Sequence, residues 1–125
     1  MNEMERIVRT FVDAYNSFDV AAMLADLHPE VEFRNFSGGT LDVELRGIEA
    51  FTAQAEFAAA IFAERRQEIV GLEVFEDRVE TVIDYAGTLA ADLPNGMKAG
   101  QSIRLSGRSV YRFDRDLIVS IEDFS

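Results

Sequence analysis

The chain has 125 residues, of which 48% are hydrophobic and 28% are charged, as in an ordinary soluble domain. Its 23 acidic and 12 basic side chains give a net charge of −11. A field of this sign repels nucleic acid and anionic membranes, so neither is an expected partner. The absence of cysteine excludes disulfides and cysteine nucleophiles. With no apolar run long enough for a membrane span and an acidic start unlike a signal peptide, we expect a cytoplasmic protein.

Helical spacing dominates the first third of the sequence. Asn2 and Glu5 form a capping box. The helix that follows has an apolar stripe made of Met4, Val8, Phe11, Tyr15 and Phe18. Asp19 can cap a second helix over residues 20–27, which should end before Pro29 because the residue preceding proline avoids helical geometry.

One strand is predicted between the second and third helices. Residues 31–36 alternate in polarity, which places Val31, Phe33 and Asn35 on one face, and the glycine turn at 37–40 ends the strand. A third helix is predicted from Gly47 to residues 65–66, where two arginines suit the carbonyl end of a helix. Its stripe is Ile48, Phe51, Ala55, Ala58 and Phe62.

The second half of the chain is predicted to be strand and turn. The strands are expected at residues 67–75, 79–90, 101–113 and 117–125, with a hairpin loop at 92–100. Helices followed by strands indicate a single α+β domain over residues 1–125, in which helices pack on one face of a curved, mostly antiparallel sheet.

Asp123 is the most informative residue of the sequence. In a strand, alternate side chains point to opposite faces, and the row Leu117, Val119, Ile121, Asp123 is apolar until its last member. An ionised carboxylate directed into an apolar interior is costly unless it is paired, protonated or used in chemistry. The alternative is that Asp123 lies at an exposed chain end.

Three further polar residues occupy strand positions where a site could form. Asn35 and Ser109 lie on rows predicted to face inward. Asp84 lies on a less apolar row than its neighbours Ile83 and Tyr85, so it faces either the site or solvent. The single histidine and the lack of cysteine argue against a metal site or a Ser-His-Asp triad.

The sequence resembles the SnoaL-like group of the nuclear transport factor 2-like superfamily. The residues that carry this resemblance are 11–16, 27–29, 45–48, 110–113 and 121–124, together with the order of the elements. The resemblance implies a cone-shaped α+β fold, with a mixed, mostly antiparallel sheet whose concave face is covered by three helices from the N-terminal half.

The resemblance also implies which catalytic groups of the superfamily are present in this sequence and which are replaced. Ketosteroid isomerases of this superfamily use a tyrosine and two aspartates, and the matching residues here are Phe11, Asn35 and Ser109. All three groups are replaced, so the chemistry of those isomerases is not expected. SnoaL-type polyketide cyclases use an acid/base aspartate on the last strand, which Asp123 matches, with Ser109 where the cyclase has histidine.

Limonene-epoxide-hydrolase-like members use two aspartates bridged by an arginine, with an asparagine and a tyrosine that help to hold a water molecule. Asp84, Asp123 and Asn35 match three of these positions. Val82 replaces the arginine and Phe33 the tyrosine.

Three functions remain open from the sequence. The first is an enzyme of cyclase, isomerase or epoxide-hydrolase type, without a cofactor, in which Asp123 is the acid or base and Asn35 and Ser109 hold the substrate oxygen or a water. Its pocket would be lined by Phe11, Tyr15, Phe33, Phe51, Ala55, Leu105 and Tyr111. The second is a protein that binds a small apolar ligand without catalysis.

The third function is association through the outer face of the sheet. Residues 67–75 are apolar on both rows, with Ile69 and Phe75 on one and Val70, Leu72 and Val74 on the other. A monomer would leave such a surface wet, so we predict a homodimer through this face.

Overall fold

Three helices and six strands make up the computed structural model, which describes residues 1–125. The helices are α1 (Glu3–Asn16), α2 (Val20–Leu24) and α3 (Ile48–Ile61). The strands are β1 (Leu27–Ser37), β2 (Thr40–Arg46), β3 (Phe62–Val74), β4 (Arg78–Leu89), β5 (Ser102–Asp114) and β6 (Leu117–Phe124). No helix has the length and apolar character that a membrane crossing requires.

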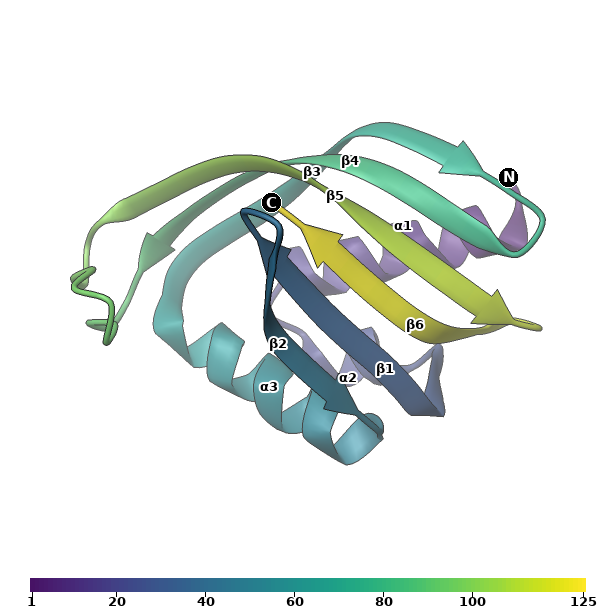
Figure 1. Ribbon diagram of the computed structural model, residues 1–125, viewed down its shortest axis with the longest axis horizontal. Coiled ribbons are helices and arrows are strands. Elements are labelled where there is room, and N and C mark those ends of the chain that lie inside the picture. The colour runs from purple at the N-terminus through teal and green to yellow at the C-terminus, as the bar shows by residue number, and fades with distance from the viewer.

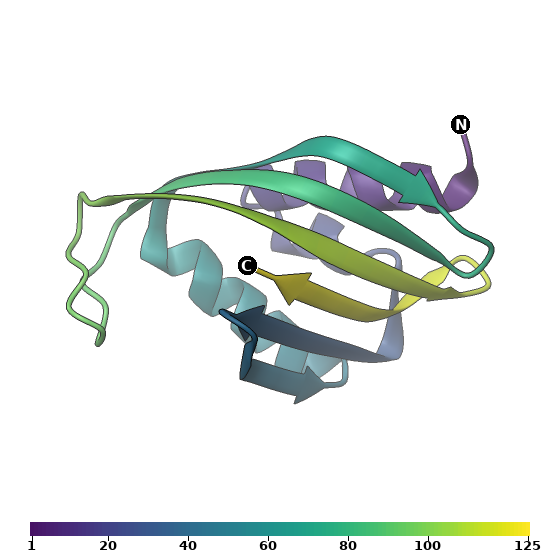
Figure 2. The same ribbon diagram turned by 45° about the horizontal axis from the view of Figure 1, so that its top comes forward.

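The six strands form one open sheet in the order β2-β1-β6-β5-β4-β3. The β1–β6 pair is parallel and the other four pairs are antiparallel. The sheet curves around the helices, which lie along its inner side (Figures 1 and 2). The prediction of an α+β fold with a mostly antiparallel sheet and three helices over its concave face is confirmed.

Cap residues start the two N-terminal helices, but only the Asn2 half of the predicted capping box forms, because the Glu5 carboxylate accepts from Arg9 Nε at 2.9 Å instead. The Asn2 side chain accepts hydrogen bonds from the N–H groups of Met4 (2.8 Å) and Glu5 (3.2 Å). Asp19 accepts one from Ala22 N–H at 3.0 Å. The inner side of α1 then packs on the sheet, where each fully buried aliphatic side chain contributes about 1.5–3 kcal/mol. This core includes Ile7, Val8, Phe11, Val12, Val79, Tyr111, Ile118 and Ile121.

The second helix is shorter than predicted, because the chain becomes extended before the proline. Helix α2 ends at Leu24, and β1 begins at Leu27 and contains Pro29. The pairing of β1 with β6 is interrupted between Leu27 and Glu32. Proline has no N–H to donate to a neighbouring strand, so this interruption is where it can be accommodated.

The third helix also ends earlier than predicted. Helix α3 stops at Ile61, and Phe62 adopts extended geometry as β3 begins. Residues from Phe62 onward pair with β4, and this long-range pairing prevails over the helical stripe that continued to Phe62. Arg65 therefore lies on a strand, buried, and its Nε donates to Tyr15 O at 2.9 Å, at the carbonyl end of α1 instead of α3.

Strand β2 was not predicted, although residues 40–46 alternate in polarity. The glycine turn at residues 37–40 does end the first strand, but it also reverses the chain into an antiparallel hairpin with β2. Asp42 is an extra residue in this hairpin, because Asn35 pairs with Val43 and Phe36 with Leu41.

Strand β6 changes face partway along its length. Arg112 pairs with Ser120 and Phe113 with Ile118, so Val119 is an extra, bulged residue. Ile118 and Ile121 are both buried, which a strict two-residue period does not allow. Asp123 keeps the inward face of Ile121, but the predicted row does not extend back to Val119.

A similar bulge changes the expected outer surface. Ile69 pairs with Ile83 and Gly71 with Val82, which leaves Val70 as the extra residue of β3. Ile69, Leu72 and Val74 all pack against the core as a result. The idea that this strand exposes apolar residues on a whole second row is therefore wrong, and Val70 and Val82 are the large apolar side chains left exposed there.

Candidate active-site pocket

A cavity of about 380 Å³ lies between the concave face of the sheet and helices α1 and α3. Fourteen of its 23 lining residues are hydrophobic, so a ligand would meet a mostly apolar wall. The structure places all seven residues named for the pocket on this wall, namely Phe11, Tyr15, Phe33, Phe51, Ala55, Leu105 and Tyr111. Leu105 is 43% exposed and stands at the mouth.

Aromatic rings from both the helices and the sheet form one part of the cavity wall. Phe51 on α3 packs edge-on against Phe33 on β1, with 5.9 Å between ring centroids. Phe11 on α1 packs against Phe51 at 6.3 Å and against Tyr111 on β5 at 5.8 Å. Because these rings come from four different elements, they fix the helices on the sheet and leave a firm apolar surface facing the cavity.

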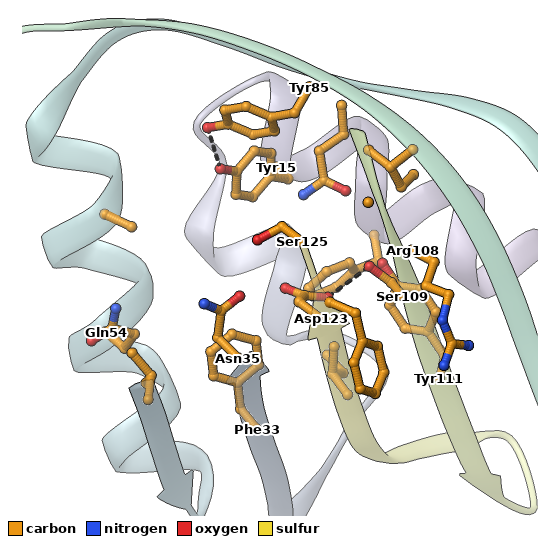
Figure 3. Close-up of a pocket in the computed structure, with 18 of the residues that line it drawn as sticks. Tyr15, Phe33, Asn35, Gln54, Tyr85, Arg108, Ser109, Tyr111, Asp123 and Ser125 are labelled. Atoms are coloured by element: carbon orange, nitrogen blue, oxygen red, sulfur yellow. Dashed lines mark hydrogen bonds between the residues drawn. The ribbon is translucent and has the colours of Figure 1, made fainter. Parts of the chain in front are cut away.

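Asp123 and Ser109 lie side by side on the sheet wall of the cavity (Figure 3). They are register partners on β6 and β5, and Ser109 Oγ donates a hydrogen bond of 2.6 Å to Asp123 Oδ1. Ser109 is 5% exposed. No basic side chain pairs with this carboxylate, so Asp123 is a part-buried acid held by a single neutral donor.

Burial raises the pKa of Asp123 to about 6, and the hydrogen bond from Ser109 lowers this pKa in part. Removing a carboxylate from water disfavours its charged form, whereas a donor to that form favours it. A group with a pKa near neutrality can exchange a proton readily in either direction at the pH of a cell. The arrangement can therefore act as a general acid or base.

Asn35 lines the same cavity but interacts with a different acid. It is the register partner of Asp123 on β1, yet its Nδ2 donates to Asp42 Oδ1 at 2.8 Å. Ser37 Oγ also donates to Asp42, at 3.0 Å. The bulge in β2 aims Asp42 at these two residues. Because β2 is not predicted from the sequence, this anchor could not be predicted either.

Asp84 is separated from the other predicted site residues. It is exposed and accepts a 3.3 Å hydrogen bond from Ser106 Oγ, while its neighbours Ile83 and Tyr85 line the cavity. Successive side chains of a strand face opposite sides of the sheet, so Asp84 lies on the outer face. Asp84 therefore faces solvent, and Asp123 is the only aspartate on the cavity wall.

The cavity also contains a pair of tyrosine hydroxyls that was not predicted from the sequence. Tyr15 on α1 and Tyr85 on β4 join their hydroxyls at 2.8 Å, at the end of the cavity away from Ser109 (Figure 3). Burial raises the pKa of both phenols. The signal for Tyr85 was present, because it continues the apolar row of Val79, Thr81 and Ile83.

No three His, Cys, Asp or Glu side chains of the protein are grouped so that they could hold a metal ion. The single histidine, His28, accepts a hydrogen bond at Nδ1 from the N–H of Glu30 at 3.0 Å, within β1.

The family of the chain follows from comparison with known proteins. The family model of the SnoaL-like domain matches residues 8–121. The chain belongs to the SnoaL-like family. This SnoaL-like domain has the fold of the nuclear transport factor 2-like superfamily. The family match stops just before Asp123, so the match itself does not include the central acid of the site.

Solved structures agree with this SnoaL-like fold at low sequence identity. A proposed polyketide cyclase from Xanthomonas campestris has a TM-score of 0.86 and 17% identity, over 98% of this chain and 90% of that one. AclR, a proposed hydroxylase from Streptomyces galilaeus, has a TM-score of 0.78 and 20% identity, over 97% and 73%. A protein of unknown function from Burkholderia pseudomallei has a TM-score of 0.77 and 23% identity, over 98% and 90%. No curated protein sequence matches the chain.

Proposed function

We propose that this SnoaL-like domain is an enzyme of cyclase or isomerase type that acts on a small, mainly apolar ketone by acid/base catalysis. The observation that carries the proposal is the Asp123 carboxylate on the wall of a mostly apolar cavity, held only by Ser109. Family membership supports a small-molecule reaction of this class. The fold alone would not, since the same architecture serves many purposes.

In the proposed reaction, Asp123 removes a proton from a carbon atom next to a carbonyl group. The electron pair of the C–H bond forms a carbon–carbon double bond, and the carbonyl oxygen becomes an enolate. If the enolate is conjugated with a second double bond, return of the proton to the far end of the conjugated system gives an isomer. Attack of the enolate carbon on a second carbonyl instead closes a ring and leaves an alkoxide, which takes the proton from Asp123. Neither course consumes an oxidant or a reductant, and Asp123 is restored at the end.

The epoxide-hydrolase alternative has less support. It requires a second carboxylate next to the first with a cation between them, but Asp84 lies on the outer face and Val82 beside it is 50% exposed. Ser109 and Asn35 keep supporting roles in the proposal. Ser109 holds the catalytic carboxylate, and Asn35, which Asp42 anchors, can contact a substrate oxygen or a water.

Deuterium exchange tests the proposal without knowledge of the natural substrate. The protein is incubated in heavy water with 1-tetralone, a compact apolar ketone, and proton NMR follows deuterium entry next to the carbonyl. The wild type should exceed the buffer rate, and Asp123→Asn should lower this excess by about 100-fold or more. Asp114→Asn, at the exposed end of β5, is the matched control and should leave the rate unchanged.

The main alternative is a non-catalytic protein that binds a small apolar ligand in the same cavity. Saturable binding of tetralone with exchange no faster than in buffer would favour this alternative over the enzyme. If tetralone shows neither binding nor exchange, both the enzyme and the binding protein would be contradicted for this class of ketone. The cavity itself favours either of them over an association domain with a filled interior.

The homodimer through the outer sheet face and the cytoplasmic location stay predictions. The apolar surface behind the dimer prediction is reduced to Val70 and Val82, which lie on neighbouring strands. Light scattering at micromolar concentration decides the oligomeric state. A dimer that Val70→Asp converts to monomer would support this face, and a wild-type monomer would contradict the prediction.

A further inference from the structure

The hydroxyl pair of Tyr15 and Tyr85 has an unused hydrogen-bond donor. Two phenols carry two protons, and their mutual bond of 2.8 Å uses one of them. Neither hydroxyl has another hydrogen-bond partner in the protein. Buried polar groups are normally satisfied, and both tyrosines line the cavity, so the second proton is available to a ligand there.

A buried cation stands behind this pair. The guanidinium carbon of Arg65 lies 3.7 Å from the ring centroid of Tyr15 and 4.5 Å from that of Phe18. Arg65 is 5% exposed and forms no ion pair, and its Nη1 and Nη2 atoms are buried without a partner. An unpaired buried charge is costly, and it favours negative charge that develops nearby.

The contact of Arg65 with the Phe18 ring depends on an unusual backbone conformation of Phe18. Phe18 has a φ of 58°, in the left-handed region that non-glycine residues rarely adopt. This conformation follows the last turn of α1, where Arg65 Nε donates to Tyr15 O at 2.9 Å. Gln67 of β3 also exchanges two hydrogen bonds with the Asn16 side chain, at 2.7 and 3.0 Å. The end of α1 is therefore held by two residues of β3, and Arg65 is the one that contacts the Tyr15 ring.

We propose that the Tyr15–Tyr85 pair binds the carbonyl oxygen of the ligand and favours its negatively charged form, with Arg65 as the positioning residue behind it. The inference rests on the proposed function, because it assigns the enolate oxygen of that reaction a binding site opposite Asp123. The ligand class is then an apolar molecule with a carbonyl, enol or phenol oxygen at one end and its reactive carbon toward Asp123.

Two charged groups have opposite effects on an anion bound at the tyrosine hydroxyls. Arg65 on β3 favours an anion at the hydroxyls, and Asp123 on β6 opposes it when ionised. Tyr111 on β5 is an uncharged neighbour of both Asp123 and Tyr15. The effect of Arg65 is therefore measured most cleanly when Asp123 is neutral, which Asp123→Asn achieves at any pH.

The test uses 4-nitrophenol, whose absorbance reports its own ionisation. When 4-nitrophenol is bound to the Asp123→Asn variant, the phenol should ionise at a lower pH than it does in buffer. Adding Tyr15→Phe and Tyr85→Phe together should weaken phenolate binding by about 10- to 100-fold. Adding Arg65→Met should lower the preference for phenolate over phenol by about tenfold. Arg66→Met, the exposed neighbour on the other face of β3, is the matched control and should change neither.

The outcomes separate this inference from the proposed function. Bound nitrophenol that ionises as in buffer, or that is indifferent to the tyrosine pair, would overturn the inference even if Asp123-dependent exchange of tetralone is found. A phenolate preference that depends on the pair would uphold it even if no exchange occurs. If Arg65→Met fails to fold by circular dichroism, Arg65→Lys keeps the charge without the planar contact and should retain part of the phenolate preference.

Discussion

Ser109 and Asp123 face each other across β5 and β6, and the serine hydroxyl donates to the aspartate at 2.6 Å. The pair has no cation, so its proton affinity is set by burial on one side and by one neutral donor on the other. This balance makes the carboxylate sensitive to small changes in its surroundings.

We expect Asp123 to titrate with a pKa of about 6, well above a free aspartate. Carboxyl-carbon NMR measures this value directly. Ser109→Ala removes the donor that favours the charged form and should raise the pKa further. Ser106→Ala, which removes the corresponding hydroxyl beside Asp84 on the outer face, is the control and should not affect Asp123. A wild-type Asp123 that titrates like a free aspartate would contradict the proposed role.

The raised pKa of Asp123 also predicts how stability depends on pH. The folded state holds the proton of Asp123 more tightly than the unfolded state, so this contribution is complete below about pH 4 and is lost as the pH rises through about 6. Asp123→Asn removes the buried charge. It should therefore stabilise the protein by up to about 3 kcal/mol near pH 8 and by much less near pH 4.

Urea denaturation at several pH values measures this difference in the free energy of unfolding. Asp114→Asn, which removes an exposed acid, controls for the general relief of negative charge. A gain from Asp123→Asn that is the same at every pH would show that the carboxylate carries no buried charge.

Gly107→Ala should displace the end of β6. A methyl group at residue 107 would overlap the carbonyl oxygen of Phe124, which is backbone and cannot rotate away. We expect a loss of about 1–3 kcal/mol in the free energy of unfolding, as for other overpacked sites, together with loss of ketone exchange because Asp123 moves. Gly71→Ala is the control, since its methyl would lie at an ordinary 3.5 Å from the Val82 side chain.

Filling the cavity should block binding without unfolding the protein. Ala58 on α3 lines the cavity, whereas Ala60 on the same helix is exposed. We expect Ala58→Phe to abolish the fluorescence increase of N-phenyl-1-naphthylamine, a neutral apolar probe, and Ala60→Phe to preserve it. Equal binding by both variants would place the ligand outside this cavity.

Period-two patterns were sufficient to place Ser109 and Asp123 on one wall, because both lie on strands with a continuous apolar row nearby. The patterns failed where the period itself is broken. Single extra residues at Val70 and Val119 reverse which row faces the core, and no local signal marks them. Arg65 was predicted at the end of the third helix but lies on β3, and its side chain contacts the end of α1. Its partner Tyr15 is 50 residues away, and only the folded sheet brings them together.

The position of β6 has a consequence for how the molecule is made. β6 is the last strand of the chain, but it lies in the middle of the sheet, between β1 and β5. Before it emerges from the ribosome, the β1–β2 hairpin and the β3–β4–β5 meander have no strand to join them, and each presents an open edge. Closing the sheet then requires contacts between distant parts of the chain, which are slow to form. The strand that completes the sheet also carries Asp123, so a nascent chain acquires the acid of the candidate site only in the step that joins these two parts of the sheet.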